Sequence, residues 1–249
     1  MGEFLTITVT NFNDSEKILR QLNSIVNQTV LPDELIISDD CSTDNSRDII
    51  QKFYDEHKDV LDITTIFHDQ NTGYNATTNY AIDKAKSKYL FMASANDYLR
   101  PTFVESLHSA PDDTALISCT SLFPATKRYE GYMIMKPYNQ SYYIPGHSSC
   151  VRKDCLLEFG CHRLEFEWHC DWFFLHAIAL KYGWYGINKE LAVKEPCDNS
   201  YANIGVTTDK QLTILSDMVH TVNSDPAFID IQDYMLSLIK NLPRSEEVL

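Results

Sequence analysis

The chain has 249 residues, and 44% of them are hydrophobic, which is enough for a sizeable buried core. Its formal net charge of −14 disfavours nucleic acid and anionic membranes as partners, because their surfaces carry the same sign. No apolar run reaches the ~18 residues of a membrane helix, and the first residues lack the basic and apolar regions of a signal peptide. We therefore expect a cytoplasmic protein with no transmembrane segment and with reduced cysteines.

The first hundred residues alternate between strand-like and helix-like segments. Runs rich in β-branched and aromatic residues predict strands over residues 4–10, 34–38, 61–67 and 89–92. Apolar residues at helical spacing predict helices between these strands. Such alternation with short connections predicts an α/β fold, in which a mostly parallel central sheet is flanked by helices.

The remainder of the chain is less regular. Its pattern predicts strands over 116–118 and 132–134, a polar and aromatic loop over 138–143, and helices over 153–159, 171–182, 210–222 and 230–241. We expect the α/β domain to comprise residues 1–205, with a C-terminal helical extension over 206–249 packed on it.

Polar clusters follow three of the predicted strands. Residues 11–14, 39–44 and 94–97 come directly after the first, second and fourth strands. In open parallel sheets, ligands bind beyond the carboxyl ends of the strands. The order of the elements therefore predicts one ligand site that the three clusters share.

These clusters belong to an ordered set of short motifs within residues 4–195. The set is Thr10-Asn11-Phe12-Asn13, Gln28-Thr29, Asp39-Asp40-Cys41-Ser42-Thr43-Asp44, Asn71-x-Gly73, Asn79, Ala93-Ser94-Ala95-Asn96-Asp97-Tyr98 and His169-Cys170-Asp171-Trp172. In order and spacing it resembles the family 2 glycosyltransferases, and Pro145-Gly146-His147 is similar to a segment of bacterial members. The resemblance implies a GT-A fold, the fold of nucleotide-diphospho-sugar transferases. It also implies inverting transfer of a sugar from a nucleoside diphosphate donor, with UDP-sugar favoured, to a hydroxyl of a glycan, lipid-linked or protein acceptor.

The resemblance further implies that residues after the first two strands hold the nucleoside. In the family, the second Asp of the pair often contacts the base, which indicates Asp40, since a carboxylate can accept a hydrogen bond from uracil N3–H or a ribose hydroxyl. The other expected donor-binding residues are Thr10, Asn11, Phe12, Asp39, Asn71, Gly73, Asn79 and Ala95. The alternative for Asp40 is a helix cap, because Asp accepts hydrogen bonds from the free backbone N–H groups of a helix start.

The cluster after the fourth strand departs from the family pattern. The family usually has Asp-x-Asp here, which holds a divalent cation on the donor diphosphate, whereas this chain has Ser94-Ala95-Asn96. Asn96 and Asp97 remain as candidate ligands for Mg²⁺ or Mn²⁺, although a neutral amide binds such a cation more weakly than a carboxylate. The departure leaves a second hypothesis open: a catalytically impaired sugar-nucleotide-binding or scaffold protein of the same fold.

Asp171 is the expected general base, because the family places this carboxylate at the start of a helix in an acidic and aromatic motif. An inverting transfer needs such a group to take the proton of the acceptor hydroxyl. Asp171 could also cap the helix that it begins, and the two roles can coexist.

A zinc-containing interaction module is a third hypothesis. Six candidate ligands lie close together in the sequence: Cys150, Cys155, Cys161, His162, His169 and Cys170. Their spacing fits no familiar zinc pattern, and the region contains no C-x-x-C pair.

Overall fold

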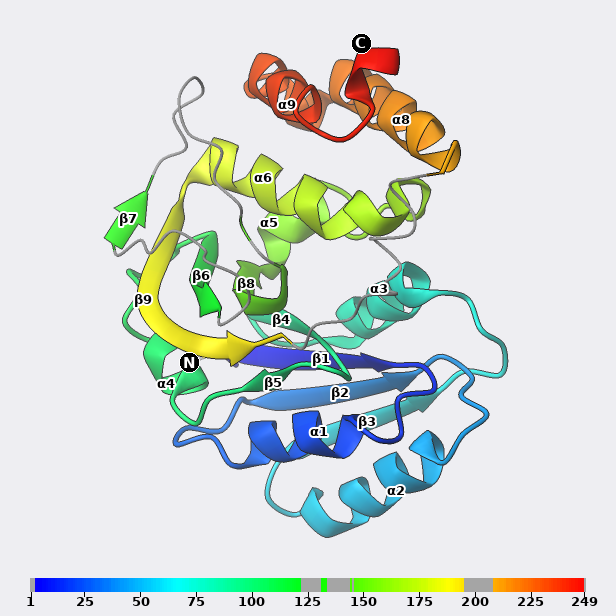
Figure 1. The fold of residues 1–249 in the computed structure, drawn as a ribbon. Helices are drawn as coiled ribbons and strands as arrows, with labels where there is room; N and C mark the ends of the chain where they lie inside the picture. Colours follow the sequence, from blue (N-terminus) through cyan, green and yellow to red (C-terminus); the bar gives the residue numbers. More distant parts are fainter. Residues whose placement is uncertain (1–2, 122–130, 134–143, 145, 195–207, 249) are drawn as a thin grey trace.

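Parallel strands form one half of the central sheet. The computed structural model describes residues 3–121, 131–133, 144, 146–194 and 208–248. The parallel strands are β1 (Leu5–Asn11), β2 (Glu34–Asp39), β3 (Asp62–Phe67) and β4 (Tyr89–Ser94), in the order β3-β2-β1-β4. They are connected by helices α1 (Ile18–Val26), α2 (Ser46–His57) and α3 (Tyr74–Lys84), close to the predicted positions (Figure 1).

The other half of the sheet is mixed. β8 (Ser149–Arg152) pairs antiparallel with β4 and with β6 (Leu116–Ser121), and β6 pairs parallel with β9 (Trp184–Val193). β9 also pairs antiparallel with β5 (Tyr98–Leu99) and with β7 (Gly131–Met133). The predicted α/β fold is confirmed, and its parallel character holds from β3 to β4 before the sheet becomes mixed.

Hydrophobic cores lie on both faces of the sheet, because successive side chains of a strand point to opposite faces. Leu35 and Ile37 of β2 join the core under α1 and α2, whereas Ile36 joins the core under α3. Helix α4 (Phe103–Leu107) packs on the first face, and α5 (Lys153–Glu158) and α6 (Cys170–Tyr182) pack on the second.

Two C-terminal helices, α8 (Lys210–Ser224) and α9 (Gln232–Ile239), extend the core on the second face. Met218 of α8 and Met235 of α9 are fully buried in the same cluster as Phe173 of α6. The predicted boundary between residues 205 and 206 lies within 195–207, outside the described residues, so the division into two parts stays a prediction. Among the helices that the structure describes, none is long and apolar enough to span a membrane.

β9 is the main element that the sequence pattern did not predict. Its middle residues, 188–190, are exposed between buried ends, and its pairing with β6 is irregular near Thr120. The strand therefore shows no sustained alternation of buried and exposed residues. Short 3-10 helices also precede β8 and α6, namely η1 (Gly146–Ser148) and η2 (Leu164–His169), and η3 (Pro226–Phe228) precedes α9. A further one, η4 (Ser245–Glu247), lies near the end of the chain. The loop predicted over 138–143 lies outside the described residues.

Candidate active site

The carboxyl ends of β1, β2 and β4 bring the three polar clusters together. Asn11 is in register with Asp39 of β2, and Thr10 is in register with Ser94 of β4. The clusters that the sequence places after separate strands therefore line one edge of the sheet, as the order of the elements predicts.

Asp39 and Asn11 form a buried network beneath this edge. Asp39 is fully buried and accepts hydrogen bonds from Asn11 Nδ2 (2.7 Å), Ser42 N (2.9 Å) and Arg47 Nε (2.9 Å). Asn11 is 1% exposed, and its amide also donates to Ser42 Oγ (3.1 Å). To contact a donor directly, both side chains would have to leave these partners. Their burial therefore indicates that Asp39 and Asn11 support the loop after β2.

Asp40 ties the second cluster to the turn before α3. The carboxylate is almost fully buried, and its two oxygens accept hydrogen bonds from Thr72 N and Gly73 N, both at 2.8 Å. Asn71 Oδ1 also accepts from Gly73 N (3.2 Å), and Gly73 has φ +89°, which favours glycine. Asp40 therefore caps the turn before α3 and does not cap α2, the helix that follows it in the sequence. Contact of Asp40, Asn71 or Gly73 with a nucleoside stays a prediction.

The remaining predicted donor-binding residues differ in how accessible they are. Phe12 is 46% exposed at the end of β1, where its ring is available for a ligand. Thr10 is buried, with its hydroxyl 3.0 Å from that of Thr78 on α3, and Ala95 is buried with its N–H donating to Thr10 O (3.2 Å). Asn79 bonds the main chain of His162 through both halves of its amide, so in this arrangement it joins α3 to the segment before α6.

The loop at residues 94–97 offers little to a divalent cation. Asp97 supplies its one carboxylate and is 6% exposed, and Asn96 supplies a neutral amide. Within the described ranges, no group of three or more His, Cys, Asp or Glu side chains is placed to hold a metal ion, and this includes the cysteine and histidine cluster considered for zinc. A hard divalent cation prefers several oxygen ligands, so the described donor set matches Mg²⁺ or Mn²⁺ poorly.

Asp171 is the second residue of α6 and lies against the start of η1. Its Oδ1 accepts a hydrogen bond from Trp172 N (2.7 Å), and a Cβ atom built on Gly146 would lie only 2.4 Å from its Oδ2. Burial raises the pKa of Asp171, while the Trp172 N–H and the charge of Lys194 oppose that rise. A carboxylate with a raised pKa is a better proton acceptor, which suits a general base.

Tyr74, which the sequence reasoning did not single out, connects Asp171 to the 94–97 loop. Although the side chain is partly exposed, desolvation of its hydroxyl raises the pKa of Tyr74, and the charges of Asp171 and Cys170 add to the rise. A hydrogen bond with the Ser94 side chain acts in the opposite direction. Tyr74 thus lies between the end of β4 and the start of α6. Its place directly after the Asn71-x-Gly73 motif was the signal that could have indicated it.

A buried polar cluster lies behind Asp171 and joins α3 to α6. Cys170 Sγ donates to Asn75 Oδ1 (2.9 Å) and lies 3.2 Å from His162 Nδ1. Asn75 Nδ2 donates to Glu167 O (2.9 Å), which holds the segment before α6. Burial lowers the pKa of His162 to about 3 and raises the pKa of the Cys170 thiol, so both side chains are neutral at physiological pH.

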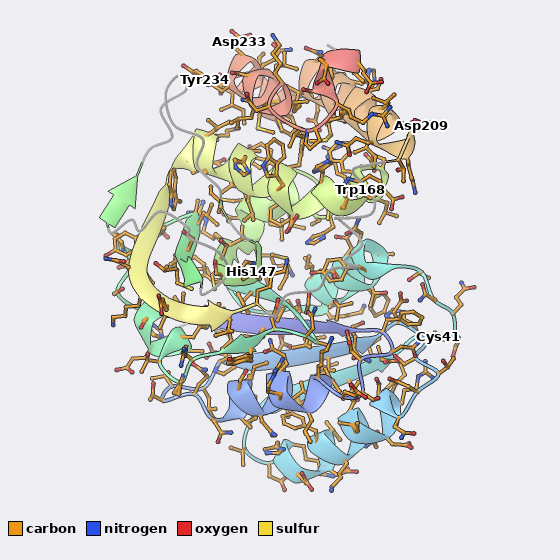
Figure 2. The ribbon with its side chains drawn as sticks, in the orientation of Figure 1. Cys41, His147, Trp168, Asp209, Asp233 and Tyr234 are labelled. Atoms are coloured by element: carbon orange, nitrogen blue, oxygen red, sulfur yellow. The ribbon has the colours of Figure 1, made fainter. Side chains whose placement is uncertain are left out.

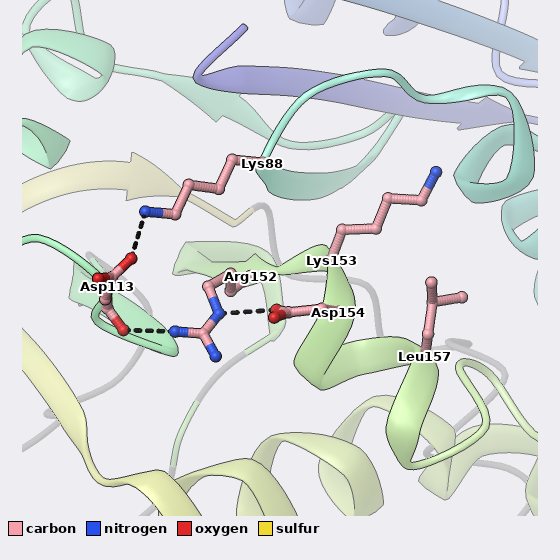
Figure 3. A pocket seen from close by; sticks show the side chains of 6 residues that line it. All are labelled: Lys88, Asp113, Arg152, Lys153, Asp154 and Leu157. Atoms are coloured by element: carbon pink, nitrogen blue, oxygen red, sulfur yellow. Dashed lines mark hydrogen bonds and ion pairs between the residues drawn. The ribbon is translucent and has the colours of Figure 1, made fainter. Parts of the chain in front are cut away.

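A separate pocket of about 510 Å³ lies at the opposite edge of the sheet, beside the start of β4 and the end of β8 (Figure 3). Its lining residues are Lys88, Asp113, Arg152, Lys153, Asp154 and Leu157. Four of its charged side chains are paired within the pocket, since Lys88 bonds Asp113 (2.8 Å) and Arg152 bonds Asp154 (2.7 Å), and Lys153 Nζ donates to Ala85 O (2.6 Å). It contains none of the predicted site residues.

The fold has counterparts among solved glycosyltransferases. *Staphylococcus aureus* TarS matches with a TM-score of 0.75 at 15% identity, over 98% of this chain and 44% of that one. Mannosyltransferase PcManGT from *Pyrobaculum calidifontis*, solved in complex with GDP-Man and Mn²⁺, matches with a TM-score of 0.66 at 16% identity, over 100% of this chain and 74% of that one. The architecture is therefore the GT-A fold of these glycosyltransferases.

Sequence comparison identifies the family. Residues 6–163 match the family described as glycosyl transferase family 2, and the chain belongs to that family. The chondroitin synthase of *Pasteurella multocida* (strain Pm70) is 29% identical over 135 residues, which are 54% of this chain and 14% of that protein. Glycosyltransferase GlyG of *Streptococcus pneumoniae* serotype 4 is 28% identical over 109 residues, 43% of this chain and 35% of that protein. The aligned segments thus span a minor part of these relatives.

Proposed function

We propose that this protein transfers a sugar from a nucleoside diphosphate donor, with a UDP-sugar favoured, to an acceptor hydroxyl with inversion at the anomeric carbon. The observation that carries the proposal is the position of Asp171. Its carboxylate stands at the start of α6, where its charge raises the pKa of Tyr74, and the Ser94 side chain at the end of β4 acts on the same hydroxyl. This shared neighbour supports a base close to a nucleotide site at the strand ends.

The reaction requires one proton transfer to the protein. The acceptor oxygen attacks the anomeric carbon, and its proton passes to Asp171. The bond between that carbon and the diphosphate oxygen breaks, and the electron pair leaves with the diphosphate. The nucleoside would lie over the ends of β1 and β2, near Phe12 and the turn that Asp40 holds. Mg²⁺ or Mn²⁺, if bound, would meet Asn96 and Asp97 and neutralise the diphosphate.

The names of similar proteins support this assignment without specifying the acceptor. Chondroitin synthases and a hyaluronan synthase are among the relatives, and TarS has been solved with UDP and with UDP-GlcNAc. We propose that the protein acts in the cytoplasm in the synthesis of a polysaccharide or related glycan, with a glycan, lipid-linked or protein acceptor.

The test is turnover of UDP- and GDP-sugars by the wild type and by Asp171→Asn, measured as release of nucleoside diphosphate. Asn keeps the shape and the Trp172 hydrogen bond but cannot take the proton. We expect turnover to fall by roughly 10²–10⁴-fold while UDP affinity and thermal stability stay close to those of the wild type. Asp233→Asn is the matched control, since it changes an exposed acid in the first turn of α9.

A second candidate, a sugar-nucleotide-binding protein without turnover, is favoured by Ser94 and Asn96 at the positions of the usual carboxylates. Binding of UDP without turnover of any donor would establish it. Full turnover in Asp171→Asn would instead remove Asp171 as the base.

A further inference from the structure

Lys194 faces the 94–97 loop across the last pairing of the sheet. β5 and β9 pair antiparallel, with Leu99 opposite Ala192 and Tyr98 opposite Val193. Lys194 and Asp97 are the next residues beyond the Tyr98–Val193 pair, so their main chains lie close together. The chain therefore sets a lysine directly beside the loop where the family pattern would hold a metal ion.

The charge of Lys194 is near enough to the proposed base to affect its ionisation. Its charge favours the ionised form of Asp171 and disfavours protonation of His147, a residue that lies between the sheet and α6 (Figure 2). Burial, with Lys194 as the lesser cause, lowers the pKa of His147 to about 3, so this histidine is neutral at physiological pH. Of these two residues, Lys194 and not His147 carries a positive charge that acts on Asp171.

A second cation supports the loop from the other side. Arg20 of α1 donates from Nη2 to Asn96 O (3.1 Å), and its guanidinium lies 4.7 Å from the centre of the Tyr98 ring. These contacts hold the main chain of the loop in place, whereas the charge of Lys194 acts on Asp171.

The charge balance of the loop favours a lysine over a metal ion. With Ser94 and Asn96 in place of carboxylates, Asp97 contributes the loop's one negative charge, and Lys194 and Arg20 contribute two positive charges. A doubly acidic loop needs a divalent cation before it can accept a diphosphate, whereas here the two cations already balance the charges of Asp97 and Asp171. An ammonium group donates charge-assisted hydrogen bonds to phosphate oxygens and needs no further ligands.

We infer that Lys194 binds the diphosphate of the donor and stabilises it as the leaving group, in the place that a divalent cation takes in a site with both carboxylates. This inference rests on the proposed function. When the bond to the sugar breaks, the negative charge that develops on the diphosphate oxygen is met by hydrogen bonds from the ammonium group. The proton of the acceptor still passes to Asp171, so the lysine remains charged throughout.

The test is calorimetric binding of UDP to the purified protein, once with EDTA and once with Mn²⁺. We expect the wild-type Kd to change by less than about threefold between the two conditions. Lys194→Met should weaken UDP binding by about 10- to 100-fold, the size of a charge-assisted hydrogen bond, and should weaken UMP binding less, because UMP lacks the second phosphate. Lys194→Arg, which keeps the charge, should restore most of the affinity.

Lys189→Met is the matched control, because it removes the same charge from an exposed position of β9, the strand that Lys194 follows. It should leave the UDP Kd within about twofold. UDP binding that requires Mn²⁺, or an unchanged Kd in Lys194→Met, would overturn the role of Lys194 while leaving the proposed function intact. Absence of UDP and GDP binding under both conditions would overturn the inference together with the proposed function.

Discussion

At the residue scale, the site depends on how close one carboxylate lies to its neighbours. Asp171 is identifiable from its motif, but its chemistry is set by groups from other elements. Tyr74 comes from α3, Lys194 follows β9, Cys170 precedes Asp171 on α6, and Gly146 begins η1. Desolvation among these groups raises the pKa of the base, and Lys194 limits the rise.

This balance predicts a pH dependence. Protonated Asp171 cannot accept the acceptor's proton, so kcat/KM should fall as pH decreases through its pKa, which lies above the ordinary carboxyl value. Lys194→Met removes a positive charge that favours the carboxylate and should move this acid limb to higher pH. The measurement is the pH profile of kcat/KM for both proteins, with Lys189→Met as control. An acid limb at the same pH in both would show that the two charges do not interact.

Gly146 allows a second prediction at this scale. A methyl group at this position would come within 2.4 Å of Asp171 Oδ2, so Gly146→Ala must displace the carboxylate or the start of η1. We expect kcat to fall by about 10²-fold, because a displacement of about 1 Å of a catalytic group has that effect, and the free energy of unfolding to fall by about 1–3 kcal/mol.

A double-mutant cycle identifies the cause of the Gly146→Ala effect. In an Asp171→Ala background the clashing oxygen is absent, so the loss of stability caused by Gly146→Ala should largely disappear. An equal loss in both backgrounds would mean that the added methyl group meets something other than Asp171.

At the element scale, the position of Asp171 depends on the connection between α3 and the segment that leads into α6. Asn79 donates to His162 O (2.7 Å) and accepts from His162 N (3.0 Å), and Asn75 holds Glu167 O nearby. Glu167 has φ +46°, an unfavourable backbone conformation for this residue, so the segment needs such partners to keep its path. The resemblance indicated Asn79 as a donor-binding residue, whereas the contacts indicate a role in positioning α6.

Asn79→Ala should therefore reduce stability and turnover together. It leaves a buried N–H and C=O of His162 without partners, which costs about 1–3 kcal/mol in the free energy of unfolding. We also expect kcat to fall more than UDP affinity, since the start of α6 is loosened while the strand ends are not. Asp83→Ala, an exposed change on the same helix, is the control for denaturant unfolding and kinetics. A loss of UDP affinity with unchanged stability would restore Asn79 to the donor site.

At the scale of the whole molecule, the C-terminal helices are part of one continuous core. Gln211 of α8 is fully buried and bonds Trp168 Nε1 (2.9 Å), His169 Nε2 (3.0 Å) and Pro243 O (3.0 Å). Trp168 and His169 lie immediately before α6, so α8 supports the same segment that α3 holds from the other side. Figure 2 shows Trp168 at this junction and Asp209 at the start of α8.

A core substitution in α8 tests this continuity. Met218 is fully buried beside α6, and Met218→Ala should lower the free energy of unfolding by about 2–5 kcal/mol. We expect one cooperative transition in the wild type and in the variant, observed by both circular dichroism and tryptophan fluorescence. Ser216→Ala, at an exposed position of α8, should leave the transition unchanged. Two separate transitions, of which only one moves in Met218→Ala, would show that residues 206–249 unfold as an independent unit.

The sequence by itself determined the parallel half of the sheet, the family resemblance and the place of the ligand site at the strand ends. These features depend on short-range patterns: apolar periodicity, turn residues, and polar clusters directly after strands. Only the tertiary structure decided that Asp39 and Asn11 are buried, that Gly146 lies against Asp171, and that Lys194 follows the pairing of β9 with β5. β9 has no sustained alternation because its middle is exposed and its pairing with β6 is irregular, so the lysine that follows it carries no local signal. Tyr74 and Asp171, which interact, are 97 positions apart in the sequence (171 − 74), and such pairings are set by the packing of the whole chain and not by any local pattern.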